Sequence, residues 1–418
     1  MTASPLAFDF SRHCPHVACG EMISVPQSRV CPHCGGDLIY CSSCRATNRV
    51  LAAHCRACGE SLASESWPAH AGIKDGEARF SAIRSIDPPR QHVRLGASVT
   101  AQMVATDGIL IVPLGDGSVS LVSESNLREI TRLALAEPVA VSATIRNGML
   151  FVASGKKLLA FDLARHLNLS SRNEIAPAWI FEGNQITQPL LADAERIYLS
   201  SRDGHRTVIE AVSQKSGASM WAAPVMMETA QTAPPLLVKN ILIIIALSGE
   251  AQAVESESGR VLGKFSLSRR LSHVSPYVAG SRALVVDENN SLYEIALSER
   301  GLKVNLIYTH PARILSLAAS EELIAIGHLS GLTLLNSRGS TVWSNDLMDS
   351  ISVAPIIASS TIFALDDAGM GLLFEAIRSN PSLRVKMLGG EVLTPPVMTH
   401  SSLAAVNAAG ELSIAAWR

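Results

Sequence analysis

Eight cysteines near the start of the chain are the residues whose spacing most clearly predicts chemistry. All of them lie within the first 58 of the 418 residues, and the remaining 360 residues contain none. They form four pairs: Cys14 with Cys19, Cys31 with Cys34, Cys41 with Cys44, and Cys55 with Cys58. In a reducing compartment, pairs spaced in this way are typical of metal ligands rather than of a disulfide framework. We therefore expect two metal sites of four thiolates each.

The four pairs can be combined into two sites in two ways. A sequential arrangement joins the first pair to the second and the third to the fourth, whereas a cross-braced arrangement joins the first to the third and the second to the fourth. We favour the sequential arrangement because Cys34 and Cys58 each begin a Cys-Gly-x-x-Leu motif, as a duplication would produce. The gaps between the pairs, eleven and ten residues, are also similar in the two halves.

The second half, Cys41-x2-Cys44-x3-Asn48-x6-Cys55-x2-Cys58-Gly59-x2-Leu62, resembles the double zinc ribbon family. This resemblance implies two structural zinc ions held by residues 10–62. The first half departs from the family in the four-residue gap after Cys14, so His13 or His16 is an alternative ligand there. Iron uses the same ligand types, but we favour redox-silent zinc. Eight thiolates for two ions leave no open position for a catalytic metal.

Local sequence and composition support a fold that depends on metal. Glycine follows the second cysteine of three pairs, at Gly20, Gly35 and Gly59, and fits a tight turn whose amides point towards the thiolates. The module has few large apolar side chains. We therefore expect each zinc ion to contribute on the order of 10 kcal/mol to its folding.

Three arginines raise a second hypothesis for this module, a sensor of single-stranded nucleic acid. Arg45, Arg49 and Arg56 could contact phosphates, and the spacing around Asn48 is also that of nucleoporin-type zinc fingers, some of which bind RNA or ubiquitin. However, Ile39 replaces the Trp of those fingers, and the whole chain is balanced at 35 basic and 37 acidic residues. Composition therefore favours neither nucleic acid nor an anionic membrane as a partner.

The residues after the cysteines predict a linker and then a strand. Residues 63–77 are mostly small and polar, as in a flexible connector, although Trp67 could dock the ribbons on the next domain. Ala78–Ile86 is predicted to be a strand, followed by a break at Pro88-Pro89. The chain has no apolar run of the roughly 18 residues that a spanning helix needs, and its start lacks a secretory pattern. We therefore expect a cytoplasmic protein.

From about residue 95 the sequence repeats with a regular period, about 42 residues long. Each copy has a short segment, often led by proline, then a turn and a very apolar strand; the copies are anchored at residues 102, 142, 189, 235, 276, 316, 355 and 396. Four strands per copy and no helical stretch predict a mostly β chain that folds as a β-propeller. The last copy leaves room for three strands, so we expect Ala78–Ile86 to supply the fourth and close eight blades, with seven as the alternative.

Ala211–Trp221 is the best-preserved copy of a recurrent motif. Ala211, Gly217 and Trp221 match Ala-x-Asp-x-x-Thr-Gly-x-x-x-Trp, so this region resembles quinoprotein-type (PQQ-like) propeller repeats. The resemblance implies such a propeller over residues 78–418. We expect Gly217 to lie in a turn whose φ only glycine adopts without strain. We expect the side chain of Trp221 to pack between neighbouring repeat units.

The sequence gives no support for catalysis by the propeller. Quinone-dependent dehydrogenases of this fold hold their cofactor with a vicinal cysteine pair, and no cysteine follows Cys58. Scattered histidines, such as His310 and His328, show no metal spacing. Acidic pairs such as Asp287-Glu288 and Asp366-Asp367 are expected in solvated turns.

We therefore predict a non-enzymatic scaffold or adaptor, with the propeller as a platform and the ribbons as a docking arm. Parts that look like this occur in bacterial multi-gene systems that couple an ATPase to propeller subunits. This likeness implies an AAA+ ATPase or a von Willebrand A protein as partner. A propeller that senses a small ligand in its central channel is a further alternative.

Overall fold

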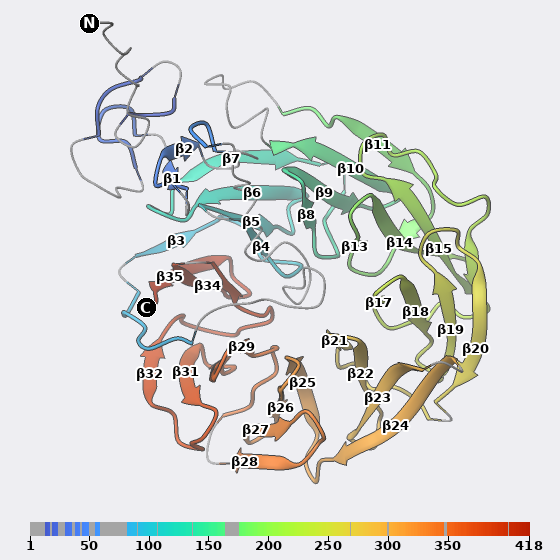
Figure 1. Ribbon diagram of the computed structural model, residues 1–418. Helices are drawn as coiled ribbons and strands as arrows, with labels where there is room; N and C mark the ends of the chain where they lie inside the picture. Colours follow the sequence, from blue (N-terminus) through green and yellow to red (C-terminus); the bar gives the residue numbers. More distant parts are fainter. Residues whose placement is uncertain are drawn as a thin grey trace, which may run out of the picture.

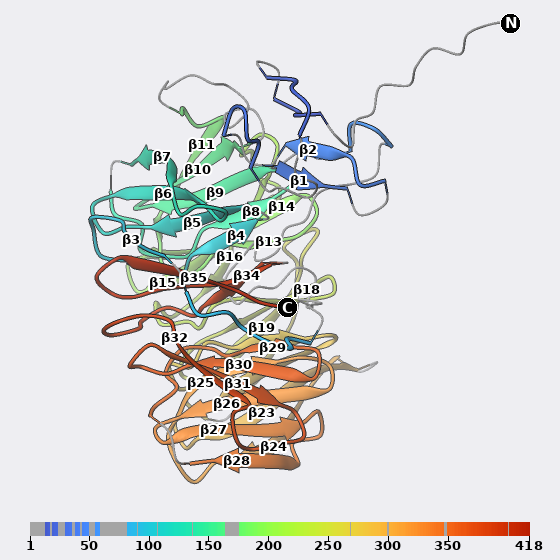
Figure 2. The same ribbon diagram turned by 90° about the vertical axis from the view of Figure 1, so that its left-hand side faces the viewer.

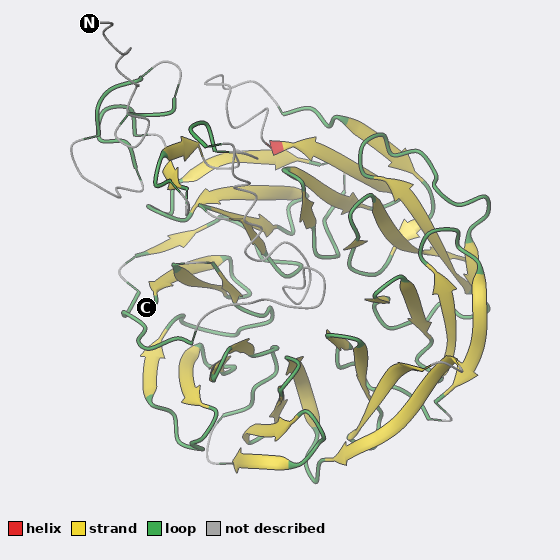
Figure 3. Ribbon diagram, in the orientation of Figure 1, coloured by secondary structure: helices red, strands yellow, loops and turns green. Residues whose placement is uncertain are grey.

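The computed structural model describes residues 13–16, 19–23, 30–35, 38–41, 44–49, 55–58, 82–89, 91–106, 108–135, 137–163, 175–267, 269–298, 301–346, 349–399 and 401–418. The predicted linker, residues 63–77, lies outside them. Every described element is a β-strand, apart from the single helical residue Leu163 (Figure 3). Within the described residues, no helix has the length and apolarity needed to cross a bilayer. The mostly β class is confirmed.

Eight antiparallel sheets follow one another along the chain and form a ring (Figure 1). Sheet 1 has β4 (Val104–Thr106), β5 (Ile109–Pro113), β6 (Ser118–Ser123) and β7 (Glu129–Ala134). Sheet 2 has β8 (Thr144–Arg146), β9 (Met149–Ser154), β10 (Lys157–Asp162) and β11 (Trp179–Glu182). Sheet 3 has β12 (Gln185–Ile186), β13 (Leu191–Ala192), β14 (Arg196–Asp203), β15 (Arg206–Ser213) and β16 (Val225–Met227). Sheet 4 has β17 (Leu236–Val238), β18 (Ile241–Ile245), β19 (Glu250–Glu255) and β20 (Val261–Ser266).

The second half of the ring repeats this order. Sheet 5 has β21 (Tyr277–Ala279), β22 (Arg282–Val286), β23 (Ser291–Ser298) and β24 (Gly301–Thr309). Sheet 6 has β25 (Ile314–Ala319), β26 (Leu323–His328), β27 (Gly331–Asn336) and β28 (Thr341–Asn345). Sheet 7 has β29 (Ile356–Ala358), β30 (Thr361–Leu365), β31 (Met370–Glu375) and β32 (Leu383–Lys386). Sheet 8 has β33 (Val397–Met398), β34 (Ser402–Val406), β35 (Glu411–Ala416) and β3 (His92–Arg94). Eight blades, rather than seven, are confirmed.

The repeat period correctly locates the innermost strand of each sheet. Seven of the eight predicted anchors lie one or two residues before such a strand, and the eighth, Ser316, lies within β25. The next strand outward is the very apolar one, as in β18, and it is buried along nearly its whole length. Outer strands such as β20 are largely exposed. The apolar strands are buried because neighbouring sheets cover both of their faces.

The hydrophobic core lies between adjacent sheets. One cluster joins Ile243 and Ile245 of sheet 4 to Ala283 and Val285 of sheet 5, and comparable clusters join other neighbours around the ring. Each fully buried isoleucine or valine side chain in such a cluster contributes about 1.5–3 kcal/mol. The stability of each sheet therefore depends on its neighbours.

The ring is closed by an N-terminal strand, as predicted, but this strand lies later in the sequence than expected. β3 pairs with β35, with Val93 opposite Leu412, whereas the predicted strand Ala78–Ile86 contributes one isolated bridge, from Ile86 to Trp417. Residues 78–81 lie outside the described residues. The pairing is interrupted at Pro88-Pro89, because proline has no amide hydrogen to donate to a ladder. The closing segment therefore follows the last sheet on both sides of this break.

A buried carboxylate joins sheet 1 to sheet 8 at the closure. One oxygen of Glu124, Oε1, accepts hydrogen bonds from the hydroxyls of Thr399 (2.5 Å), Ser401 (2.6 Å) and Ser402 (2.6 Å). The other, Oε2, accepts one from the amide of Gly108 (2.9 Å). Only 6% of Glu124 is exposed, so these bonds replace the hydration that the carboxylate loses.

Candidate metal centres

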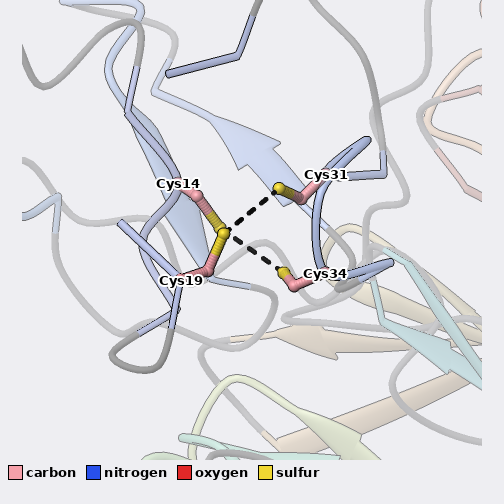
Figure 4. A group of neighbouring side chains, drawn as sticks. All are labelled: Cys14, Cys19, Cys31 and Cys34. Carbon is pink, nitrogen blue, oxygen red and sulfur yellow. Dashed lines mark hydrogen bonds between the residues drawn. The ribbon is translucent and has the colours of Figure 1, made fainter. Parts of the chain in front are cut away.

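The N-terminal segments that carry the eight cysteines lie outside the ring (Figures 1 and 2). Their thiols form two groups of four. The first group is Cys14, Cys19, Cys31 and Cys34 (Figure 4), and the second is Cys41, Cys44, Cys55 and Cys58. In each group all four sulfur atoms lie within 4.8 Å of one another. This grouping is the sequential one that the duplicated motif predicted. Among the described residues, neither His13 nor His16 belongs to either group.

The distances between sulfur atoms suit a shared tetrahedral ion. Sγ of Cys14 lies 3.7 Å from that of Cys34, and the Sγ atoms of Cys44 and Cys55 are 3.5 Å apart. A disulfide would need about 2.05 Å, and none of the eight cysteines is joined to another by a disulfide bond. Four sulfurs at about 2.3 Å from a zinc ion would be separated by roughly 3.8 Å. The donor set therefore fits two structural metal ions.

Short turns place the thiols of each pair on one side. The amide of Gly35 donates to the carbonyl of Cys31 (2.9 Å), and the amide of Arg45 donates to that of Cys41 (2.9 Å). Gly20 and Gly35 adopt positive φ, as their predicted turns require. Arg45 adopts the same left-handed backbone at φ 60°, so the third pair makes this turn without glycine.

Hydrogen bonds lower the pKa of one thiol in each group. Burial opposes ionisation of Cys31, but the amides of Cys34 and His33 outweigh it and lower its pKa to about 7. At Cys55 burial is likewise outweighed, here mainly by the amides of Cys58 and Ala57, and the pKa falls to about 6. Each group thus holds a thiol that readily becomes the thiolate that a metal binds.

The spacing of the second ribbon places an asparagine beside its thiols. Asn48 is buried, and its Nδ2 donates to the carbonyl of Ala46 (2.8 Å) and approaches Sγ of Cys55 at 3.6 Å. Its Oδ1 accepts from the amide of Arg56 (2.9 Å). Asn48 therefore fixes the turn that carries Cys55 and also supplies a donor to its sulfur.

The two ribbons are linked by side chains of the second. β1 (Leu38–Tyr40) pairs with β2 (Thr47–Arg49), and Thr47 Oγ1 donates to the carbonyl of His13 (2.5 Å). Arg56 Nη2 donates to the same carbonyl and to Thr47 Oγ1 (2.6 Å), while Arg49 Nε donates to the carbonyl of Pro15 (2.8 Å). Both carbonyls flank Cys14. Two of the three arginines considered for phosphate contacts are therefore engaged in holding the first metal group.

In the propeller, the sequence interpretation missed one pair of histidines. His310 and His328 come from neighbouring sheets, are almost fully buried, and have ring centroids 4.4 Å apart. Both Nε2 atoms lie within hydrogen-bond distance of Thr333 Oγ1, at 3.1 and 3.2 Å. Only the three-dimensional arrangement could show this pair, because the two histidines belong to different copies of the repeat.

The acidic residues that were expected in solvated turns do lie in turns, but the first of each pair is buried. Asp287 Oδ1 accepts from the amides of Asn289 and Ser291, both at 2.8 Å, and Asp366 Oδ1 accepts from that of Met370 (2.7 Å). Asp287 is 1% exposed and Asp366 5%. The expectation of solvation was wrong for these two, because their carboxylates bind turn amides instead of water.

Taken together, the fold and the thiol groups define a β-propeller protein with a cysteine-rich module outside its ring. Residues 204–415 match the family model described as "Outer membrane protein assembly factor BamB" (PQQ_2), and this match spans just over half of the chain. The chain belongs to this family, which confirms the PQQ-like resemblance.

Many solved structures share the fold, and three of them serve as examples. BamB from Moraxella catarrhalis is 16% identical with a TM-score of 0.61, covering 80% of this chain and 98% of that one. The computationally designed Ika8 protein is 10% identical with a TM-score of 0.64, covering 79% and 100%. Sqt1 from Saccharomyces cerevisiae is 16% identical with a TM-score of 0.64, covering 80% and 100%. At these identities the likeness shows the fold alone. A comparison with curated proteins finds no significant match.

Proposed function

We propose that this chain is a non-enzymatic scaffold, in which the propeller is a platform for other proteins and two zinc-loaded ribbons form a second docking arm. The observation that carries the proposal is the closed geometry of both thiol groups. Four sulfurs already surround each centre, so a bound ion would have no free position for a substrate and would instead organise the chain. The family model, described as an assembly factor, supports a role in bringing proteins together.

Zinc is the metal that this donor set favours. Four soft thiolates at tetrahedral separations suit Zn²⁺, which would be held by the four cysteines of each group and would supply folding free energy. The buried Asn48 and the bridging Arg56 would then maintain the geometry around both ions.

The nucleic-acid alternative is less well supported than the scaffold. Binding to single strands needs positive groups free to follow a phosphate chain and aromatic surfaces on which bases stack. The side chains of Arg49 and Arg56 are directed to backbone carbonyls of the first ribbon instead. Arg45 is the exposed member of the three.

The proposal also includes a cellular location and a class of partner protein. We propose that the protein is cytoplasmic, and its eight thiols arranged for metal binding are compatible with a reducing compartment. The sequence likeness to ATPase-linked bacterial systems makes an AAA+ ATPase or a von Willebrand A protein the first partner to test.

Affinity purification of the full-length chain from its native host tests this function. We expect the wild type to retain a partner in stoichiometric amount, and a variant with Cys41→Ser and Cys44→Ser to lose it while the propeller stays folded. A variant with Ser42→Ala and Ser43→Ala, in the same segment, is the matched control and should retain the partner. A wild-type chain that carries no stoichiometric partner would contradict the scaffold, and retention by the cysteine variant would rule out the docking arm.

A further inference from the structure

A cavity of about 360 Å³ lies on the axis of the ring. Its described lining comes from seven of the eight sheets, at the segments that lead into or form their innermost strands. We call it the axial cavity. Its volume falls within the roughly 300–1,000 Å³ that is typical of small-molecule sites.

The axial cavity is polar but carries no strong charge. Hydroxyl and amide side chains face it from several sheets, among them Gln102, Ser142, Ser275, Ser316 and Thr394. No acidic residue, lysine or arginine occurs in its described lining. An ionic ligand would lose hydration there without gaining a countercharge, so charged molecules are disfavoured.

Apolar surfaces alternate with these hydroxyls. Leu315, Val353 and Leu393 also line the cavity, and Leu393 is 57% exposed although its side chain is large and apolar. A ligand with both hydroxyl groups and C–H faces would match such a lining, whereas a purely apolar ligand would leave the hydroxyls unsatisfied.

The side chain of Thr394 is a second observation, independent of the cavity volume, that favours a polar group on the ligand. Thr394 is 8% exposed, and within the part of the chain that the structure describes its Oγ1 is buried and has no hydrogen-bond partner. A buried hydroxyl left unsatisfied costs about 1–3 kcal/mol. By contrast, Ser316 Oγ already donates to the carbonyl of Ile351 (2.8 Å) and keeps its lone pairs free to accept. The lining thus holds one hydroxyl whose hydrogen-bonding capacity is unused and a second, at Ser316, that can still accept.

We infer that the axial cavity binds a neutral polyhydroxylated molecule of the size of a mono- or disaccharide or a cyclitol. This inference goes beyond the scaffold role and does not depend on the zinc ribbons. The hydroxyls of Thr394 and Ser316 would bind ligand hydroxyls, and the leucine and valine side chains would cover its C–H faces.

Thermal unfolding of the full-length protein, with D-glucose, maltose and myo-inositol as neutral probes and glucose 6-phosphate and gluconate as anionic ones, tests the inference. We expect at least one neutral probe to raise the Tm with a saturable dependence on concentration, and neither anion to do so. Isothermal titration calorimetry then gives the Kd. The absence of a shift with every neutral probe, or equal shifts with the anions, would overturn the inference.

Two variants locate the site. Ala354→Phe places a bulky ring in the cavity and should abolish binding, whereas Ala223→Phe, at an exposed position outside the described lining, should leave it unchanged. Thr394→Val keeps the side-chain shape and should raise the Kd about tenfold, which corresponds to about 1.4 kcal/mol. Unchanged binding in Thr394→Val, or in a folded Ala354→Phe variant, would overturn the site. If Ala354→Phe does not fold, the Kd of the nearly isosteric Thr394→Val variant shows whether the ligand binds in the axial cavity.

Discussion

Trp179 and Gly217 lie against each other across the boundary between sheets 2 and 3. A Cβ added to Gly217 would come within 2.5 Å of Trp179 Cε3, and the Trp179 indole donates to the carbonyl of Gln214 (2.9 Å) in the same turn. Trp221 makes the same two contacts, the packing against a glycine and the indole hydrogen bond, across the boundary between sheets 3 and 4. A Cβ on Gly259 would lie 2.6 Å from Trp221 Cδ2, and its indole donates to the carbonyl of Ser256 (3.0 Å). The glycine and tryptophan of the repeat therefore meet between successive copies.

This relationship predicts that Gly217→Ala destabilises the propeller by about 2–4 kcal/mol, since it combines a positive φ of 70° with a steric clash. The matched control is Gly204→Ala, where φ is 60° but an added Cβ meets nothing within 4 Å. In the Gly204→Ala control, the free energy of unfolding should fall only by the cost of the left-handed backbone, about 1–2 kcal/mol. Urea denaturation measures the free energy of unfolding of both variants. Equal decreases in the two variants would show that the contact with Trp179 contributes nothing.

The carboxylate at the ring closure gives a second prediction. Glu124→Gln keeps the shape of the side chain but replaces one acceptor oxygen with a donor, while the Gly108 amide and three hydroxyls still need acceptors. We expect a loss of about 1–3 kcal/mol in the free energy of unfolding. Glu257→Gln, at an exposed position, is the control. Unchanged stability of the Glu124 variant would mean that this carboxylate does not hold the closure together.

The buried histidine pair predicts a dependence of stability on pH. Burial, with a smaller contribution from neighbouring His310, lowers the pKa of His328 from 6.5 to about 4, although Asp346 acts in the opposite direction. The unfolded chain therefore binds a proton below pH 6.5 that the folded chain accepts only near pH 4, so stability falls as the pH is lowered through this window. The contribution is on the order of 2–3 kcal/mol.

His328→Gln removes this titrating group. Denaturant unfolding measured from pH 7 to pH 4 should therefore show a smaller loss of stability for His328→Gln than for the wild type. His205→Gln, whose wild-type side chain is 80% exposed, should behave like the wild type. Identical pH profiles for His328→Gln and the wild type would exclude His328 as the source of acid sensitivity.

The bridge between the two ribbons predicts coupling between their metal sites. Arg56→Met keeps the length of the side chain but removes the donors to the carbonyl of His13 and to Thr47. Loss of such a supporting contact typically weakens metal binding by about 10- to 100-fold. We expect zinc transfer to a chromogenic chelator to become about tenfold faster, and Arg45→Met, at an exposed position, to leave it unchanged.

The same variants separate the structural role of Arg56 from nucleic-acid recognition. With a labelled single-stranded RNA, we expect no salt-dependent change in fluorescence anisotropy for the wild type. Strong binding that disappears in Arg56→Met, with no change in zinc release, would favour the nucleic-acid sensor instead.

Much of the fold could be predicted because the repeat is encoded locally. Apolar runs such as Ile241–Ile245 specify strands that are covered on both faces, and the regular spacing of these runs specifies how often a sheet recurs. The closing strand was predicted at the wrong position because the local sequence of Ala78–Ile86, although it favours a strand, carries no information about its pairing partner. The position of β3 depends on its pairing with β35, which lies at the opposite end of the propeller sequence.

The thiol groups were also predictable, since duplication leaves a visible spacing. The roles of Arg49 and Arg56 were not, because an arginine that donates to a backbone carbonyl has the same local sequence as one that faces phosphate. His310 and His328 escaped prediction for a similar reason, because adjacent sheets bring them together.

Metal analysis of the purified full-length protein tests the central claim most directly. Inductively coupled plasma mass spectrometry should find two zinc ions per chain. It should find one in a variant with Cys41→Ser and Cys44→Ser, because all four cysteines of the first thiol group are unchanged. A chain that contains iron, or no metal, or whose cysteines are joined as disulfides, would contradict the account.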